Sequence, residues 1–424
     1  MAKVKVLVFP AGEVNSIELH DALSTCVNIE LFGASSVDRH GSYKFKNYIS
    51  GLPLITEDNF LEKLNYIIEK HSIDIVIPTH DSVVLFFSKN RDQILSKILV
   101  PDGNAAEICR YKSLTYKTLE GYSFIPKIFN DFDEFPLFIK PDDGQGGKDT
   151  FLIKDKSEIP VSINLDNYVL CEYLPGEELS VDCFTDKNGE LLIVSPRLRE
   201  RTMAGISVAG RNIEISDEIK YIAECINTKI TFLGLWFFQI KKDKFGDWKL
   251  LEISTRCASS MSLTRSLGYN LPLMSIYTAM GYDVKPLHQN YNVQMDRTLI
   301  SRYKIDYEFD SVYIDFDDTI IIRGKVYLPA MWLIYQMNNL GKKVFLITRH
   351  EGNLNKTLEK YKISKDLFYE IIHIIDYKPK SYYMNPNKAI FIDNAFQERL
   401  EVNKMHNIPV FDVDAIEVLM DWVV

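Results

Sequence analysis

An apolar run ends in two carboxylates in the stretch Val312-Tyr313-Ile314-Asp315-Phe316-Asp317-Asp318-Thr319. Its β-branched and aromatic residues predict a buried strand, so Asp315 and Asp317 would project from the strand end. Of two such carboxylates, the first can attack a phosphoryl group and the second can shuttle a proton. Together they can also hold Mg²⁺. The stretch therefore predicts phosphate chemistry at the end of a buried strand.

The residues around this stretch alternate between strand and helix patterns. This alternation predicts a doubly wound parallel sheet, an α/β architecture, in residues 308–424. The predicted strands cover residues 311–315, 343–348, 371–375, 388–392 and 410–413.

The beginning of the chain also predicts a βαβ pattern. An apolar strand breaks at Pro10-Ala11-Gly12, and an amphipathic helix follows. The turn lacks the G-x-G-x-x-G fingerprint, so residues 1–95 predict a Rossmann-like scaffold layer without a dinucleotide. The predicted strands cover residues 4–9, 28–33 and 73–78, and the predicted helices cover residues 16–23 and 59–71.

Between these parts, residues 96–300 show the alternation of half-buried strands. Turn residues at 186–189 and 243–247 predict hairpins, so we expect an α+β domain built on antiparallel sheets. A polar join at 296–309 leads to the last domain. The predicted strands of the middle domain are 137–140, 150–153, 168–173, 179–184, 191–195, 232–241 and 248–253.

Composition and net charge limit the classes of molecule that we expect the chain to bind. With 424 residues, several domains are expected, and a net charge of −9 argues against nucleic acid or an anionic membrane. No apolar run approaches the roughly 20 residues that span a bilayer, and the opening residues predict a strand instead of a signal peptide. The 6 cysteines form no C-x-x-C pair, which is typical of a reducing cytoplasm. Homo-oligomer formation is compatible with the sequence.

A glycine-rich loop follows a predicted strand in the middle domain. Lys140 ends that strand, and Gly144, Gly146 and Gly147 follow it. Glycines let backbone N–H groups approach phosphates, and a lysine neutralises their charge. Glycine-rich hairpins are common, so this loop alone does not decide the function.

Three further motifs follow this loop along the chain: residues 169–174 with Glu172, residues 176–182 with Glu178, and residues 237–240 with Gln239. With these motifs, residues 1–290 resemble the ATP-grasp superfamily, in particular its carbamoyl-phosphate-synthetase-like and amino-acid-ligase branches. The stretch 250–256 reads Leu-Leu-Glu-Ile-Ser-Thr-Arg, where the family has Glu-x-Asn-x-Arg. The resemblance implies Mg²⁺ ligands at Gln239, Glu252 and Ser254, and the serine puts the second metal position in doubt. A satisfied core amide at Gln239 and a surface charge at Glu178 are the structural alternatives. The resemblance implies ATP binding by Lys112, Lys140, Gly144, Gly146, Gly147, Glu172, Tyr173, Leu174 and Glu178.

Such a site implies an ATP-dependent carboxylate–amine ligase, which needs Mg²⁺, with Mn²⁺ as an alternative. A carboxylate attacks ATP to give an acyl phosphate, and an amine then displaces phosphate while Arg256 steadies the oxyanion. Alternation on a strand would aim Arg197, Arg199 and Arg201 the same way, toward an anionic substrate. A solvated charged strand is the alternative for these arginines.

The opening stretch resembles the first motif, D-x-D-x-T, of the haloacid dehalogenase (HAD) superfamily. The resemblance implies a phosphatase in which Asp315 becomes an aspartyl phosphate, Asp317 moves the proton and Thr348 binds the phosphoryl oxygen. Lys378 is preferred as the charge-neutralising lysine over Lys380 and Lys388. The implied Mg²⁺ ligands are Asp315, Asp317 and Asp393, with Glu398 as a further acidic group.

Motif spacing leaves little room for a cap domain. About 30 residues separate Asp317 from Thr348, and about as many separate Thr348 from Lys378. We therefore expect a capless HAD pocket that is open or covered by the ATP-grasp domain.

Three functions are compatible with these motifs. The leading one joins a small-molecule carboxylate to an amine, one of them phosphorylated, and couples this ligase to a phosphatase acting on a phosphorylated substrate or product. The second is a phosphatase with a regulatory nucleotide-binding module, and the third is an ATP-grasp kinase. The sequence does not identify the substrates or the order of the two reactions.

Overall fold

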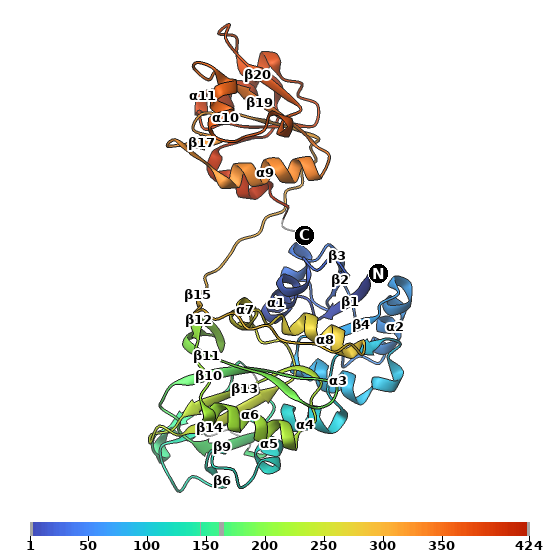
Figure 1. Ribbon diagram of the computed structural model, residues 1–424, viewed down its shortest axis with the longest axis vertical. Helices are drawn as coiled ribbons and strands as arrows, with labels where there is room; N and C mark the ends of the chain where they lie inside the picture. Colours follow the sequence, from blue (N-terminus) through green and yellow to red (C-terminus); the bar gives the residue numbers. More distant parts are fainter. Residues whose placement is uncertain (1–2, 145, 161–164, 422–424) are drawn as a thin grey trace. The chain divides into compact units, whose positions relative to one another are not determined.

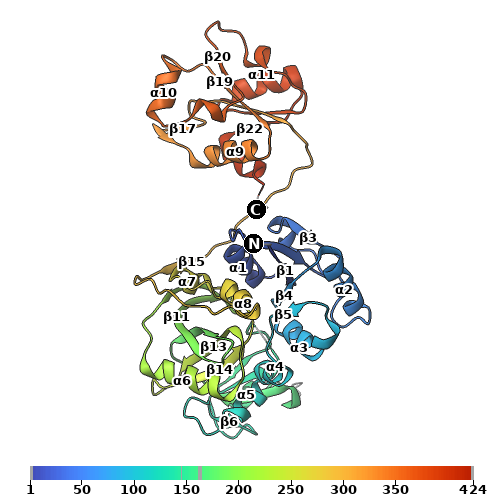
Figure 2. The same ribbon diagram turned by 45° about the vertical axis from the view of Figure 1, so that its right-hand side comes forward.

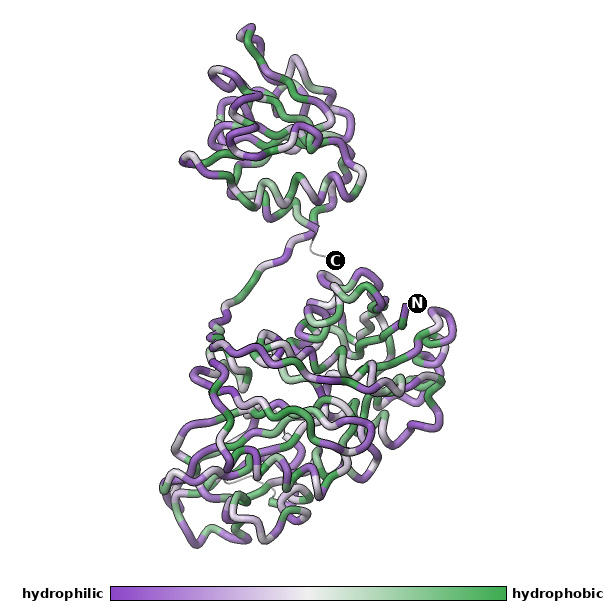
Figure 3. The backbone as a smooth tube through the Cα atoms, in the orientation of Figure 1, coloured by the Kyte–Doolittle hydropathy of each residue, from purple (hydrophilic) through white to green (hydrophobic). Residues whose placement is uncertain are grey.

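The computed structural model describes residues 3–144, 146–160 and 165–421. It forms two compact units, Met1–Leu299 and Ile300–Val423. Figure 3 shows hydrophobic stretches of the chain running through the interior of each unit. Within the described part of the chain, none of the helices combines the length and the apolar character needed to cross a membrane.

The expected domains at 1–95 and 96–300 lie together in the first unit, and the division at residue 299 falls within the expected polar join. The last strand of the first sheet, at 97–98, lies just beyond the boundary expected at 95.

A five-stranded parallel sheet begins the first unit. Its strands are β1 (Val4–Phe9), β2 (Ile29–Ala34), β3 (Asn47–Ile49), β4 (Ile75–Pro78) and β5 (Lys97–Ile98), and its helices are α1 (Val14–Leu23), α2 (Phe60–His71) and α3 (Asp81–Lys89). The strand order is β3-β2-β1-β4-β5. Helix α2 buries Phe60, Leu64 and Ile67 at helical spacing against this sheet.

Two antiparallel sheets form the rest of the first unit. The smaller contains β6 (Ile128–Phe129), β7 (Leu137–Pro141), β8 (Phe151–Ile153) and β9 (Tyr168–Glu172) in the order β6-β9-β7-β8. The larger contains β10 (Glu178–Thr185), β11 (Leu191–Met203), β12 (Ile206–Asn212), β13 (Gly234–Lys242), β14 (Trp248–Ser254) and β15 (Gln294–Asp296) in the order β14-β13-β10-β11-β12-β15. Both predicted hairpins are confirmed, because β10 pairs with β11 and β13 pairs with β14.

The remaining helices of the first unit are α4 (Gly103–Arg110), α5 (Lys112–Thr118), α6 (Asp217–Lys229), α7 (Ser262–Ser266) and α8 (Leu271–Ala279). Helices α3 and α4 pack against each other, and both views show them side by side (Figures 1 and 2). The parallel sheet is thereby joined to the layer that carries β14, which α4 also contacts.

The second unit is built on a five-stranded parallel sheet, which confirms the predicted strand arrangement. Its elements are β16 (Ser311–Ile314), β17 (Ile321–Ile322), β18 (Lys325–Val326), α9 (Leu328–Asn339), β19 (Lys343–Thr348), α10 (Leu354–Lys360), β20 (Glu370–His373), β21 (Ala389–Ile392), α11 (Phe396–His406) and β22 (Val410–Phe411). The sheet order is β20-β19-β16-β21-β22. Val312 and Ile314 pack on one face of β16, whereas Tyr313 stacks on Phe345 on the other, so both faces are buried.

Strand β11 departs from the expectation in a way that affects the site. It continues past the end predicted at residue 195, because it pairs with β10 on one side and with the unpredicted β12 on the other. Gly210 in β12 interrupts the apolar alternation, and a Cβ there would overlap the carbonyl oxygen of Leu198. The pairing register of β11 shifts around Arg199 and Arg201, where the strand bulges.

The two units should unfold in separate transitions, because each hydrophobic cluster of the described residues lies within a single unit. Phe238→Ala should destabilise the first unit by about 3–5 kcal/mol, and Leu346→Ala should destabilise the second by about 2–5 kcal/mol. Both side chains are fully buried. Differential scanning calorimetry would show each variant shifting one transition only. A common shift in either variant would show that the units unfold together.

Candidate active site

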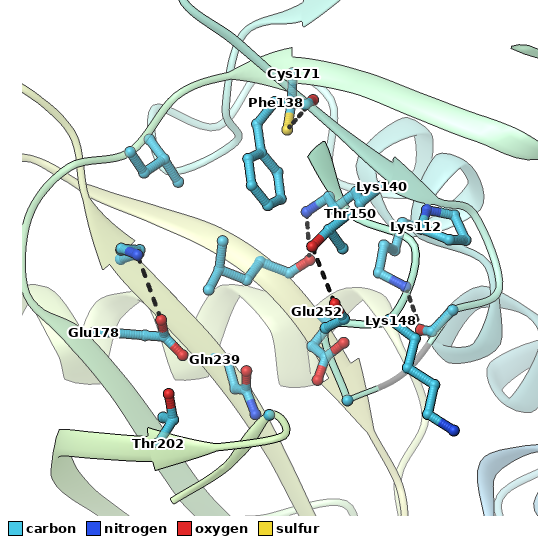
Figure 4. Close-up of a pocket in the computed structure, with 18 of the residues that line it drawn as sticks. Lys112, Phe138, Lys140, Lys148, Thr150, Cys171, Glu178, Thr202, Gln239 and Glu252 are labelled. Atoms are coloured by element: carbon cyan, nitrogen blue, oxygen red, sulfur yellow. Dashed lines mark hydrogen bonds and ion pairs between the residues drawn. The ribbon is translucent and has the colours of Figure 1, made fainter. Parts of the chain in front are cut away.

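A cavity of about 400 Å³ opens between the two antiparallel sheets of the first unit. Strands β7, β9, β10, β11, β13 and β14 contribute to its wall, together with the glycine-rich loop after β7. All residues predicted to bind ATP line it: Lys112, Lys140, Gly144, Gly146, Gly147, Glu172, Tyr173, Leu174 and Glu178. Gln145 of the same loop lies outside the described residues. Figure 4 shows Lys112, Lys140 and Lys148 on one side and Glu178, Gln239 and Thr202 on the other.

Lys140 is a buried cation with defined partners. Its Nζ donates to the Tyr116 hydroxyl at 2.6 Å and to the Leu251 carbonyl at 3.1 Å. Burial opposes the charge, but Tyr116, Cys171 and Glu252 together outweigh burial, so the pKa of Lys140 lies above its usual value. Burial in turn raises the pKa of Tyr116 to about 12. Lys140 therefore stays positively charged at the wall of the cavity.

The glycine-rich loop is fixed to the start of α5. The Asp142 carboxylate accepts hydrogen bonds from the Ser113 backbone and hydroxyl, both at 2.7 Å. Lys112 Nζ donates to the Gly144 carbonyl at 2.7 Å, and burial lowers the pKa of Lys112. This attachment places a second cation beside the loop backbone.

A second turn meets the glycine-rich loop. Gly146 and Gly205, which lies between β11 and β12, have φ angles of 67° and 75°. A Cβ at Gly205 would overlap the backbone of Gly146, so only glycine allows this approach. Both turns line the cavity and enclose one end of it.

The wall of the cavity also carries amide and carboxylate oxygens. Gln239 on β13 pairs directly with Glu252 on β14, and both line the cavity. Such oxygen donors suit Mg²⁺, which keeps several waters and shares phosphate oxygens. Among the described residues, no three acidic, histidine or cysteine side chains gather as a self-contained metal site. The donor set therefore fits a cation that arrives with phosphates.

Ser254 does not join this set, which corrects its predicted role as a metal ligand. Its hydroxyl donates to Asp81 Oδ1 at 2.7 Å, and it does not line the cavity. Arg256 also lies outside the wall, and its Nε donates to Asp81 Oδ2 at 2.9 Å. Both side chains are directed to the parallel layer, from which Asp81 comes.

The predicted arginine cluster is also corrected. Arg197 is buried and forms two hydrogen bonds of 2.6 Å with Asp182, whereas Arg201 is exposed and pairs with Asp296. The bulge in β11 breaks the alternation that would align the three side chains. Only Arg199 lines the cavity, and its Nε lies 2.7 Å from Glu178 Oε1 as an ion pair without hydrogen-bond geometry.

In the second unit, two buried carboxylates share one lysine. Lys380 Nζ lies 2.6 Å from Asp315 and 2.6 Å from Asp393, which follow the neighbouring strands β16 and β21. Thr348 ends β19 on the other side of β16. Burial raises the pKa of Asp315 and of Asp393, although Lys380 opposes this shift.

Lys378, which the sequence favoured, is not at this cluster. Its Nζ lies 3.5 Å from Asp376 and over the Tyr382 ring, and its side chain is half exposed. Lys380 is instead buried at the start of a short 3-10 helix. Lys388 is exposed beside Asp310. The structure thus corrects the choice of lysine.

Asp317 departs from the expected metal set. Its carboxylate lies 2.9 Å from His350 Nδ1 and is half exposed, while Glu398 pairs with Arg349. The three-carboxylate magnesium set of Asp315, Asp317 and Asp393 is therefore not assembled among the described residues.

Sequence reasoning missed several partners of the site residues. Tyr116 and Asp81 belong to no recognisable motif. Their partners Lys140 and Ser254 lie 24 and 173 positions away along the chain. His350 could have been noticed, since it follows Thr348 by two positions at a strand end.

The chain is similar to known proteins in part of its sequence and in its fold. Residues 164–299 match a family described as ATP-grasp in the biosynthetic pathway with Ter operon. None of the curated proteins matches the chain.

Solved structures share the fold. The biotin carboxylase domain of Hydrogenobacter thermophilus 2-oxoglutarate carboxylase, in complex with MgADP, ADP and bicarbonate, aligns with a TM-score of 0.56 and 14% identity over 69% of this chain and 74% of that one. Staphylococcus aureus N5-carboxyaminoimidazole synthetase, complexed with ADP, gives 0.56 and 13% over 68% and 80%. An L-amino acid ligase from Bacillus licheniformis gives 0.54 and 13% over 68% and 75%. Residues 164–299 thus match an ATP-grasp family, and about two thirds of the chain shares the fold of these solved structures.

Proposed function

We propose that the first unit is an ATP-dependent carboxylate–amine ligase. The observation that carries this proposal is that Lys140, Lys112, Gln239 and Glu252 all line one cavity. Two of the similar structures hold ADP, one of them with magnesium, which supports a nucleotide in the cavity of this chain.

Each wall of the cavity suits one part of ATP. Apolar groups from Phe138, Leu174 and Leu251 suit the adenine, and Glu178 suits the ribose hydroxyls. The lysines and the glycine-rich loop suit the phosphates. Glu252 and Gln239 would hold Mg²⁺, which neutralises phosphate charge when bound.

The proposed reaction has two steps. A substrate carboxylate oxygen attacks the γ-phosphorus of ATP, and the bond to the β-phosphate oxygen breaks to give an acyl phosphate and ADP. The amine nitrogen then attacks the acyl carbon, inorganic phosphate leaves, and the nitrogen loses a proton as the amide forms. Lys140 and Lys112 stabilise the charge of the first step, and Arg256 is assigned to the oxyanion of the second.

We further propose that the second unit is a Mg²⁺-dependent phosphohydrolase of the HAD type, acting on a phosphorylated substrate or product of the ligase. Lys380 between Asp315 and Asp393 supports this proposal, because it would neutralise an attacked phosphate. Asp315 attacks phosphorus, Asp317 protonates the departing oxygen, and water then releases phosphate from the aspartyl phosphate. Between Asp317 and Thr348 the chain forms only the β17–β18 hairpin and α9, which supports a capless site.

The ligase predicts ADP release that depends on a carboxylate and an amine together. Lys140→Met should lower this rate at least about 100-fold, because a buried charge at the phosphates is lost. Lys242→Met is the matched control, since Lys242 lies on β13 but pairs with Glu177 outside the cavity. The measurement is coupled ADP release across a matrix of carboxylates and amines, including phosphorylated amines. ADP formation with one substrate alone, which gains a phosphoryl group in mass, would show a kinase instead.

Magnesium dependence should separate Glu252 from Ser254. Glu252→Gln should raise the half-saturating Mg²⁺ concentration of ADP release at least about tenfold, because a charged oxygen ligand is lost. Ser254→Ala should change it less than about twofold, because the hydroxyl is bonded to Asp81. Titration of both variants with MgCl₂ at saturating ATP tests this. Equal shifts in the two variants would restore Ser254 as a ligand.

The phosphatase should depend on Lys380 and not on Lys378. Lys380→Met should lower Mg²⁺-dependent hydrolysis of p-nitrophenyl phosphate at least about 100-fold, whereas Lys378→Met should lower it less than about threefold. Asp315→Asn provides the inactive reference. Loss of activity in Lys378→Met alone would contradict this assignment.

A further inference from the structure

Asp81 links the parallel sheet to the strand that carries Glu252. It is the first residue of α3, directly after β4, so the parallel layer fixes its backbone. Its two carboxylate oxygens accept separate hydrogen bonds, one from Ser254 and one from Arg256. These partners lie two positions apart: Ser254 is the last residue of β14, and Arg256 lies in the bend that follows.

The guanidinium of Arg256 is held through two of its three nitrogens. Its Nε–H group donates to Asp81, its Nη1 donates to the Cys257 carbonyl at 3.2 Å, and its carbon lies 5.5 Å from the centre of the Phe237 ring. Over residues 3–144, 146–160 and 165–421, Nη2 has no hydrogen-bond partner. Two N–H donors therefore remain available on a group whose plane is fixed.

The charges of this pair are stable at neutral pH. Burial favours a neutral Asp81, but Arg256 and the Ser254 hydroxyl outweigh it and lower the pKa of the carboxyl. Burial likewise opposes the charge of Arg256, but Asp81 raises its pKa. Removing either partner would leave the other as an uncompensated buried charge.

We propose that Asp81 is a positioning residue that aims the Nη2 edge of Arg256 at the oxyanion of the amide-forming step; this rests on the ligase function proposed above. The Ser254 hydroxyl fixes the second carboxylate oxygen and so sets the orientation of Asp81. Serine thereby has a role at a position where the ATP-grasp resemblance implies asparagine.

A purely structural link between the layers is the competing explanation, and the chain offers a matched control for it. Glu18 of α1 accepts hydrogen bonds of 3.1 Å from Nε and Nη2 of Arg265 in α7. This buried carboxylate joins the same parallel layer to α7. If Asp81 only joined the layers, Asp81→Asn and Glu18→Gln would behave alike.

The test measures kcat of pair-dependent ADP release, the KM for ATP and the melting temperature of the full chain. Asp81→Asn should lower kcat about 10–100-fold and change the KM for ATP less than about twofold, because an oxyanion donor is displaced while the nucleotide cavity is intact. Glu18→Gln should leave kcat within about twofold of wild type. Adding Asp81→Asn to Arg256→Gln should lower kcat no further, since the two residues act as a unit.

Three results would overturn the proposal: a kcat of Asp81→Asn equal to that of Glu18→Gln, a change in the KM for ATP alone, or a full additional loss of kcat when Asp81→Asn is added to Arg256→Gln.

If Asp81→Asn does not fold, Ser254→Ala is decisive, because it removes one of the two hydrogen bonds to Asp81. It should lower kcat about 2–10-fold at unchanged KM for ATP, and an unchanged kcat would reject the proposal. Failure of the ligase function itself is distinguishable, because wild type would then show no pair-dependent ADP release.

Discussion

The buried ammonium of Lys140 organises the first unit. A cation removed from water must be hydrogen-bonded, or it destabilises the fold by several kcal/mol. Its partners come from α5 and β14, while the lysine itself comes from β7. One charge therefore requires a helix and both antiparallel sheets to keep their register. The cavity lies where these elements meet, so the group that stabilises the assembly also faces the proposed phosphates.

The charged cluster of the second unit has an excess of carboxylates, in contrast to the lysines around the cavity of the first unit. Two buried carboxylates share the single ammonium of Lys380, which leaves the cluster net negative. Such a cluster favours a cation, whereas the lysines around the glycine-rich loop favour an anion. The carboxylates of the second unit follow the ends of parallel strands, whereas the cavity of the first unit lies between two antiparallel sheets.

Sequence patterns could predict the residues at the ends of buried strands, because hydrophobic period and strand termination locate them. Lys140, Glu252, Asp315 and Asp393 are of this kind. Patterns could not separate Lys378 from Lys380, since the start of a 3-10 helix decides which one is buried.

The alignment of Arg197, Arg199 and Arg201 failed for another reason. A bulge changes the strand period locally, and Asp182 on the neighbouring strand captures the first arginine. Tyr116 was not predictable because its site partners arise only in three dimensions.

Ser254 shows why a departure from a motif is better interpreted with its spatial partner than alone. In the sequence, serine at this position only weakens a metal site. In the structure, its short side chain reaches a carboxylate supplied by a layer 173 positions away. The Ser254 hydroxyl lies 2.7 Å from Asp81 Oδ1, so the residues at positions 81 and 254 are in direct contact. In the proposed ligase, the parallel sheet, for which the sequence predicts only a scaffold role, positions the guanidinium of Arg256 through Asp81.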